Sequence, residues 1–104
     1  MSEAPVYMVA NFVIEDPEEY RRYEKGFFPL LRRYGGEFIT YDDNPATLEG
    51  DRLMGRMVMF RFPSEEAARS WFADADYQAL AKHRRAGTRN NFLTLMHGLP
   101  SRDN

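Results

Sequence analysis

The segment Val6–Ile14 constrains the fold more than any other part of this sequence. Its residues, VYMVANFVI, are apolar at both alternating positions, and the segment lies between Pro5 and Glu15-Asp16-Pro17. Successive side chains of a strand point to opposite faces, so a strand covered on one face only alternates more cleanly between apolar and polar residues. We therefore expect a strand that is covered on both faces.

Two helix starts follow the usual capping rules. Asp16 is a candidate N-cap, Pro17 suits the first helical position, and Glu19 lies where a capping box places a carboxylate. Ser64 is the candidate cap of a second helix, with acidic residues in the first turn where the helix dipole favours them. The first helix is expected to end in a left-handed cap that begins at Gly35.

The remaining strands are expected at about 37–41, 53–62 and 91–97, and a short additional helix follows the second one. The order β-α-β-β-α-β has short connections. Because βαβ crossovers are right-handed, this order predicts an α+β, ferredoxin-like sandwich with an antiparallel sheet of spatial order 4-1-3-2 and both helices on one face. Residues 1–98 are expected to form one domain, and residues 99–104 a flexible C-terminal tail.

This arrangement leaves one sheet face bare. Met8, Ala10, Phe12 and Ile14 share one parity of the first strand, and the third strand adds a second apolar row. A bare apolar face on the order of several hundred Å² is large for a soluble monomer and marks an interface. We therefore expect a homodimer in which two sheets pack face to face across a two-fold axis, and a charge at Phe12 is expected to undo it.

Five short motifs are specific in combination. They open and close the first helix, precede and form the third strand, and follow the second helix: DPEEY at 16–20, RYGGEF at 33–38, LEGD at 48–51, RMVMFRFPS at 56–64 and DYQ at 76–78. In this combination the chain, from about Val6 to Gly98, resembles the bacterial family catalogued as domain of unknown function 1330, within the dimeric α/β-barrel superfamily. The resemblance implies the fold and a dimer. It carries no catalytic residue, because the family has no agreed activity.

Members of the superfamily that degrade haem use an Asn on the first strand, a Trp on the second helix and a His ten residues after the Trp. Asn11 and Trp71 match, but the residue ten places after Trp71 is Ala81, and the nearest histidine is His83. A displacement of two residues rotates a side chain by about 200° on a helix. We therefore expect Asn11 and Trp71 to lie close together on the helix side of the sheet without His83, and we expect no cofactor.

Four residues are candidates for binding a small molecule between sheet and helices: Asn11, Arg56, Trp71 and Tyr77. Asn11 and Trp71 are also the candidates for catalysis. The Asn11 amide would hydrogen-bond either a ligand or a neighbouring group, because an unpaired buried amide costs about 1–3 kcal/mol. Trp71 and Tyr77 would either pack in the core or line the pocket, and the Tyr77 hydroxyl needs a partner in both cases.

Basic residues offer two further features. Arg56 and Arg61 lie on the third strand at opposite parities, so one of them faces the helices and the other the expected dimer barrel. A sheet arginine inside the barrel would clamp a carboxylate, or it would pair with Glu37 or Glu49. The run KHRR at 82–85 is either a solvated helix C-terminus, where the helix dipole favours positive charge, or an anion site.

Several classes of function are not expected. The chain has no cysteine, which excludes disulfides and thiol chemistry, and it has no His-x-x-x-His metal pair and no Gly-rich phosphate loop. A net charge of −2, and a third strand without the basic-glycine-aromatic pattern, argue against nucleic acid. No apolar run reaches a membrane span and no signal pattern opens the sequence, so we expect no membrane partner and a cytoplasmic location.

Two functions remain open. The first is a homodimeric protein that binds a small organic molecule between each sheet and its helices. The second is a cofactor-independent monooxygenase or isomerase that acts on an aromatic or lactone-like substrate. The first is favoured by the lack of a convincing acid–base pair near Asn11, and an enclosed pocket with convergent polar groups would favour the second.

Overall fold

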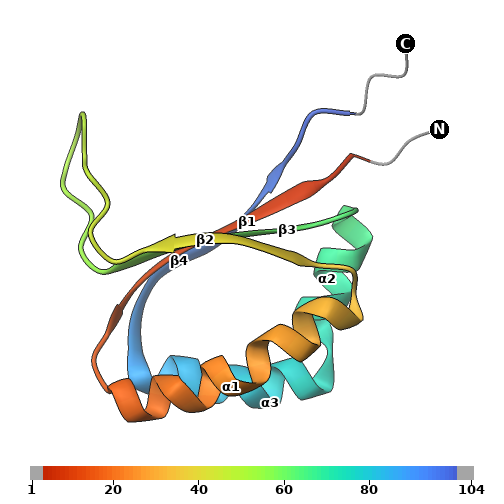
Figure 1. The fold of residues 1–104 in the computed structure, drawn as a ribbon, viewed down its shortest axis with the longest axis horizontal. Helices are drawn as coiled ribbons and strands as arrows, with labels where there is room; N and C mark the ends of the chain where they lie inside the picture. Colours follow the sequence, from red (N-terminus) through yellow and green to blue (C-terminus); the bar gives the residue numbers. More distant parts are fainter. Residues whose placement is uncertain (1–3, 101–104) are drawn as a thin grey trace.

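The computed structural model describes residues 4–100, which form a four-stranded sheet and three helices (Figure 1). In chain order the elements are β1 (Val6–Ile14), α1 (Pro17–Arg33), β2 (Glu37–Asp42), β3 (Arg56–Phe62), α2 (Glu65–Ala73), α3 (Ala75–Gly87) and β4 (Thr88–His97). The strands are ordered β2-β3-β1-β4, every pair is antiparallel, and the helices lie together on one side of the sheet (Figure 1). The predicted ferredoxin-like α+β fold with order 4-1-3-2 is therefore confirmed.

Both ends of α1 have the predicted caps. The Asp16 side chain accepts a hydrogen bond from the backbone N–H of Glu19 at 3.2 Å. At the other end Gly35 has a φ of 75°, and the N–H of Gly36 donates to the carbonyl oxygen of Leu31 at 2.9 Å. The left-handed glycine satisfies the last helical carbonyls and turns the chain directly into β2.

The second helical region consists of two helices that meet at Asp74. Ser64 caps α2 by accepting a hydrogen bond from the N–H of Ala67 at 3.1 Å. The Asp74 carboxylate accepts hydrogen bonds from the Tyr34 hydroxyl, from the first turn of α3 and from Arg33 at 3.0 Å. The bond from Tyr34 in particular lowers the pKa of Asp74 to about 2. Asp74 therefore ties the end of α1 to the junction of α2 and α3.

Two strands differ from their expected bounds. β3 begins at Arg56 rather than near residue 53, because the chain turns just before it at Gly55, which has a φ of 87° and lies against the backbone of Phe12. β4 begins at Thr88, directly after α3, rather than near residue 91. Of the tail expected at 99–104, residues 101–104 lie outside the described residues.

The core lies between the sheet and the helices and takes one parity of β1. Val6, Met8, Ala10 and Phe12 are all buried there, and the Phe12 ring centre lies 5.4 Å from that of Tyr20 on α1. The expectation that Met8, Ala10, Phe12 and Ile14 face the bare side is wrong, since Ile14 packs against the same core. Both parities of β1 are apolar, so the pattern did not specify which of them the helices cover. The bare side, here called the outer face, carries the opposite parity: Tyr7, Val9 and Val13 of β1, Met57 and Met59 of β3, and Phe92 and Met96 of β4.

Gly55 provides a test of how β1 and β3 are joined. An added Cβ at Gly55 would lie 2.3 Å from the carbonyl oxygen of Phe12, whereas Gly50, with a similar φ of 89°, has no atom within 4 Å of its added Cβ. We predict that Gly50→Ala lowers the free energy of unfolding by about 1 kcal/mol, the cost of the left-handed backbone alone. Gly55→Ala should lower it by more than about 3 kcal/mol, because strain and overlap add. Urea unfolding measures both, and equal losses would contradict this account.

Candidate functional site

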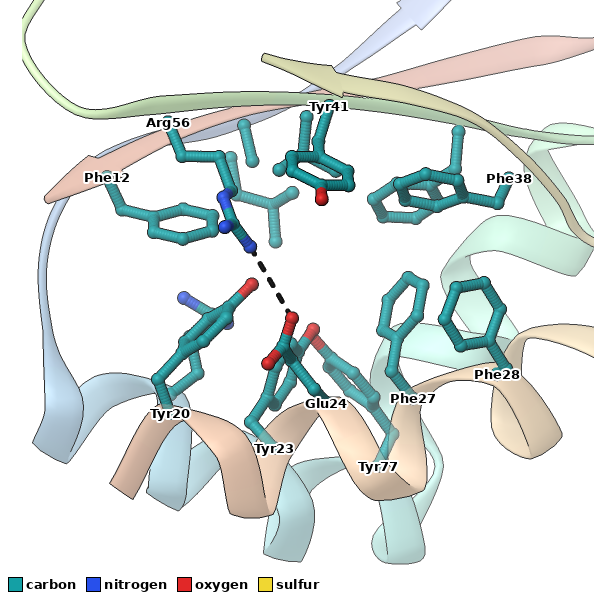
Figure 2. Close-up of a pocket in the computed structure, with 15 residues that line it drawn as sticks. Phe12, Tyr20, Tyr23, Glu24, Phe27, Phe28, Phe38, Tyr41, Arg56 and Tyr77 are labelled. Atoms are coloured by element: carbon teal, nitrogen blue, oxygen red, sulfur yellow. Dashed lines mark hydrogen bonds and ion pairs between the residues drawn. The ribbon is translucent and has the colours of Figure 1, made fainter. Parts of the chain in front are cut away.

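A cavity of about 120 Å³ lies between the sheet and helices α1 and α3 (Figure 2). Its walls are mainly aromatic, with four tyrosines and five phenylalanines, the latter being Phe12, Phe27, Phe28, Phe38 and Phe60. The rings of Phe27 on α1 and Phe60 on β3 meet with centres 5.3 Å apart. An apolar cavity of about 150 Å³ binds benzene, so this central cavity is of the size of one aromatic ring.

Polar groups from both layers line the central cavity. In Figure 2 the Arg56 guanidinium from the sheet points toward the Glu24 carboxylate and the Tyr20 hydroxyl of α1. The other polar groups of the lining are the hydroxyls of Tyr23, Tyr41 and Tyr77 and the guanidinium of Arg84. The hydroxyls of Tyr23 and Tyr77 are hydrogen-bonded to each other at 2.9 Å. Burial raises the pKa of Tyr20 to about 12 and that of Tyr23 well above its usual value. Both hydroxyls therefore keep their protons at neutral pH.

Arg56 enters the cavity from the start of β3, where carboxylates compensate its charge. Its Nε lies 2.6 Å from Oδ1 of Asp43, and its Nη1 lies 3.5 Å from Oε2 of Glu24. Its Cζ also lies 4.3 Å from the ring centre of Tyr41, within the range of a cation–π interaction. Burial lowers the pKa of Arg56, but its interactions with Asp43 and Tyr20 together outweigh this and the net shift is upward. Arg56 is thus a charged, well-anchored part of the cavity wall.

The expected partners of Arg56 are wrong. Neither Glu37 nor Glu49 is within 4 Å of its guanidinium among residues 4–100. Because β2 runs antiparallel to β3, Glu37 is in register with Arg61, at the far end of β3. The residue that reaches Arg56 is Asp43, which directly follows β2.

Arg84 projects from α3 into the same cavity and is only 6% exposed. Its Cζ lies 5.6 Å from the ring centre of Tyr23. Unlike Arg56, it has no carboxylate within 4 Å in the part of the chain that the structure describes. Sequence reasoning missed this residue because the basic run was interpreted as one unit. The helical spacing of Tyr77, Ala81 and Arg84 places these three on one helix face and was the available signal.

The other members of the basic run point away from the central cavity. Lys82 and Arg85 are exposed, and Arg85 donates a hydrogen bond to Gln78 at 3.1 Å. His83 contacts the Glu19 carboxylate through its Nδ1. As expected, His83 does not line the cavity. The run therefore divides into one buried charge and three outward-facing residues.

Asn11 is not on the helix side of the sheet. Its chain neighbours on both sides line the cavity, so alternation along β1 places Asn11 toward the outer face. Its Nδ2 donates to the carbonyl oxygens of Met54 (3.0 Å) and Arg56 (3.1 Å), and its Oδ1 accepts from Asn91 (2.6 Å), beside the register shift between β1 and β4. The expected proximity of Asn11 and Trp71 is therefore wrong, since nothing in an apolar strand indicated which face the amide takes.

Trp71 and Tyr77 lie together in the core. Both are fully buried, and their ring centres are 4.0 Å apart. Trp71 also packs against Phe60 and Phe62, and its Nε1 has no hydrogen-bond partner among residues 4–100. Only Tyr77 reaches the cavity, with Trp71 behind it. Of the four predicted site residues, the structure thus brings Arg56 and Tyr77 to the cavity wall.

A second, wider cavity of about 790 Å³ lies between α2, α3 and β4. Arg84 and Leu93 line both cavities, so Arg84 stands at the boundary between them. Arg69 and Arg85 lie on the wall of the second cavity, which has no acidic residue among the described residues that line it. Arg69 is paired with Glu65 at 2.6 Å, so Arg84 is the arginine of this wall that is both buried and without a carboxylate within 4 Å in residues 4–100.

Among residues 4–100, no group of three or more His, Cys, Asp or Glu side chains could hold a metal ion. No helix in this region is long and apolar enough to cross a membrane. The central cavity is therefore the site on which we base the functional proposal.

A family model described as Domain of unknown function (DUF1330) matches residues 5–99. The chain belongs to this family. The predicted resemblance is thereby confirmed, and no curated protein matches the DUF1330 chain.

Solved structures share the fold of this DUF1330 protein. A protein of unknown function from Rhodopseudomonas palustris is 21% identical with a TM-score of 0.79, over 93% of this chain and 84% of that one. SnoaB, a cofactor-independent oxygenase from Streptomyces nogalater, is 17% identical with a TM-score of 0.62, over 97% and 96%. A dimeric ferredoxin-like protein of unknown function from Thermobifida fusca is 11% identical with a TM-score of 0.53, over 93% and 92%.

The raised pKa of Tyr20 leads to a prediction at alkaline pH. An unfolded tyrosine loses its proton near pH 10, whereas Tyr20 in the fold holds its proton to about pH 12. Its contribution to stability is therefore fully present below pH 10 and is lost as the pH rises through 12. We predict that Tyr20→Phe removes about 2 kcal/mol of this alkaline destabilisation by pH 11.5. Urea unfolding from pH 8 to pH 11.5 measures it, and parallel pH profiles for the two proteins would contradict it.

Proposed function

We propose that this protein binds a small organic molecule with a single aromatic ring in the central cavity. The observation that carries the proposal is the combination of ring-sized aromatic walls with polar groups that converge from both layers. Ligand sites are typically concave and largely apolar, with a few polar groups that fix orientation. The central cavity has both properties.

The geometry supports binding of a flat ring. Phe27 and Phe60 present an edge-to-face pair at the wall, and aromatic rings gain about 0.5–1.5 kcal/mol from such contacts beyond the area they bury. The rim is open to solvent at Phe28 and Tyr41, which are 43% and 53% exposed. A ligand would therefore enter between α1 and β2 and place its polar substituent against the hydroxyls at the centre.

Filling the cavity tests the proposal. Ala10 lines the cavity, whereas Ala86 on α3 is exposed and does not. We predict that Ala10→Leu weakens binding of single-ring compounds such as benzoate and benzamide at least tenfold, because the added carbons occupy the space for the ring. Ala86→Leu adds the same atoms outside the cavity and should leave the Kd unchanged. Isothermal titration calorimetry measures both.

Native mass spectrometry of the purified wild-type protein complements this titration, because it would detect a molecule that co-purifies. Circular dichroism establishes that Ala10→Leu is folded, and Val58→Phe, at another cavity residue, is the alternative filling variant. If no single-ring compound binds, or if binding survives both substitutions, the central cavity is not the binding site.

The proposal includes a homodimer formed through the outer face. Val9 and Met59 are cross-strand neighbours at its centre and are only half-buried in the single chain. Soluble proteins seldom leave a contiguous apolar patch of this kind exposed. The dimeric description of the similar Thermobifida fusca protein supports a second copy of this chain as the partner.

A charge at the centre of the outer face should prevent assembly. We predict that Met59→Asp converts the dimer to a monomer at micromolar concentration, because a carboxylate would be desolvated without a partner. Leu48→Asp, at a 93% exposed loop position, is the matched control and should remain dimeric. Light scattering coupled to size exclusion distinguishes the two, whereas Phe12→Asp would test the core instead. A monomeric wild-type protein would refute the dimer.

A second candidate function is a cofactor-independent monooxygenase or isomerase. The observation that favours it is the Glu24 carboxylate, which lines the cavity opposite Arg56 and beside tyrosine hydroxyls. A carboxylate can accept a proton from an acidic position of a bound substrate while cationic and hydroxyl groups stabilise the resulting anion. Loss of substrate turnover, with retained binding, in Glu24→Gln would separate this function from binding alone.

A further inference from the structure

The central cavity contains more hydrogen-bond donors than the protein can pair, and this surplus points to the charge of its ligand. The first unpaired donors belong to one of its two arginines, as a comparison of their carboxylate partners shows. Arg56 faces Asp43 and Glu24, so two carboxylates oppose its single positive charge. Arg84 is more deeply buried and faces no carboxylate within 4 Å in residues 4–100. A buried charge without a partner is costly, so such residues are usually paired.

The Tyr23–Tyr77 pair provides a further unpaired hydrogen-bond donor. Two hydroxyls carry two protons, and their mutual hydrogen bond uses only one of them. The Arg84 guanidinium also interacts with both hydroxyls, but it can only donate and so does not take the remaining proton. One O–H is therefore left to donate, and it lies on the same cavity wall as the five N–H donors of Arg84.

We propose, building on the function proposed above, that Arg84 and the Tyr23–Tyr77 pair bind the carboxylate of a small aromatic acid. A carboxylate accepts hydrogen bonds and donates none, and its two oxygens match the planar fork of a guanidinium. The acid's ring would occupy the phenylalanine-lined part of the central cavity, which is of the size of one ring.

The charge of Arg84 itself favours an anion over a neutral group. The two other arginines of the adjoining second cavity have partners outside it: Arg69 lies 2.6 Å from Glu65, and Arg85 donates a hydrogen bond to Gln78. Burial lowers the pKa of Arg84, but its interactions with the Tyr77 and Tyr23 side chains outweigh this and the net shift is upward. Arg84 therefore remains charged, and a ligand carboxylate would supply the partner that the described chain does not.

A pair of matched ligands tests the charge. Benzoate and benzamide have nearly the same shape, but only benzoate is an anion that accepts at both substituent atoms. We expect the wild-type protein to bind benzoate at least tenfold more tightly than benzamide in calorimetric titrations. Arg84→Gln should reduce this preference to about twofold or less. Arg85→Gln removes the same charge from the neighbouring exposed position and should retain the preference.

The outcomes separate this inference from the function on which it rests. Equal binding of the two ligands to the wild-type protein would overturn the role of Arg84 while leaving the cavity as a binding site. A preference that survives Arg84→Gln but is lost in Arg85→Gln would overturn it as well, because the anion would then lie in the second cavity. Binding of neither ligand would overturn both proposals.

Two further variants protect the test against misfolding. Arg84→Lys keeps the charge but loses the planar fork, so it should retain part of the preference for benzoate. Tyr23→Phe removes a hydroxyl from the pair and should also weaken benzoate more than benzamide. The melting temperature adds an independent measurement: benzoate should raise it in the wild-type protein and in Arg85→Gln, and by less in Arg84→Gln. A rise in Arg84→Gln equal to that of the wild-type protein would contradict the inference.

Discussion

Contact between aromatic side chains of the two layers is the constraint on which the rest of this structure depends. Tyr20 of α1 meets Phe12 of β1, Phe27 meets Phe60 of β3, and Trp71 of α2 packs against Phe60 as well. Large rings on both layers keep the helices at a distance that small aliphatic side chains could not bridge. Flat rings that meet at their edges also leave space between them. The same contacts that stabilise the sandwich thus create the central cavity.

Much of the fold could be predicted because its signals are local. The cap at Asp16, the cap at Ser64 and the left-handed Gly35 each depend on residues within one helical turn, and all three are observed. Short connections between the elements then leave few topologies. The late start of β3 could not be predicted in this way. It depends on the approach of Gly55 to the backbone of Phe12, which is distant in sequence.

The face of each strand residue was harder to predict than the strand itself. A shift of one residue exchanges the two faces, and β1 is apolar on both, so its pattern is compatible with either choice. The face that the helices cover determines the position of Asn11. On the outer face its side-chain amide forms hydrogen bonds with Met54, Arg56 and Asn91, beside a register shift. The covered face also determines that Phe12 belongs to the core. The burial of Trp71 and Tyr77 could be predicted without knowing which face of β1 the helices cover, because both residues lie on the helices.

Arg84 shows why a charge pattern and a helical pattern must be considered together. Arg84 belongs to a basic run at the C-terminal end of α3, where positive charge interacts favourably with the helix dipole. That interaction alone explains why a basic run is found at this place in the sequence. The spacing of Arg84 from Tyr77 and Ala81 instead places it on the buried face, while Lys82 and Arg85 remain exposed. An unpaired buried charge lowers the stability of a fold, and such residues persist where function requires them.

In the proposed complex, stability and function therefore act through one residue. Without a ligand, α3 holds the Arg84 guanidinium against the Tyr23 ring, a contact that compensates only part of the lost hydration. A carboxylate bound at the same place would satisfy the charge. Because that stabilisation exists only in the folded protein, binding would also strengthen the packing of α3 on α1 and on the sheet. Tyr23 lies on α1 and Tyr77 on α3, so their shared hydroxyl site connects ligand binding to the contact between these helices.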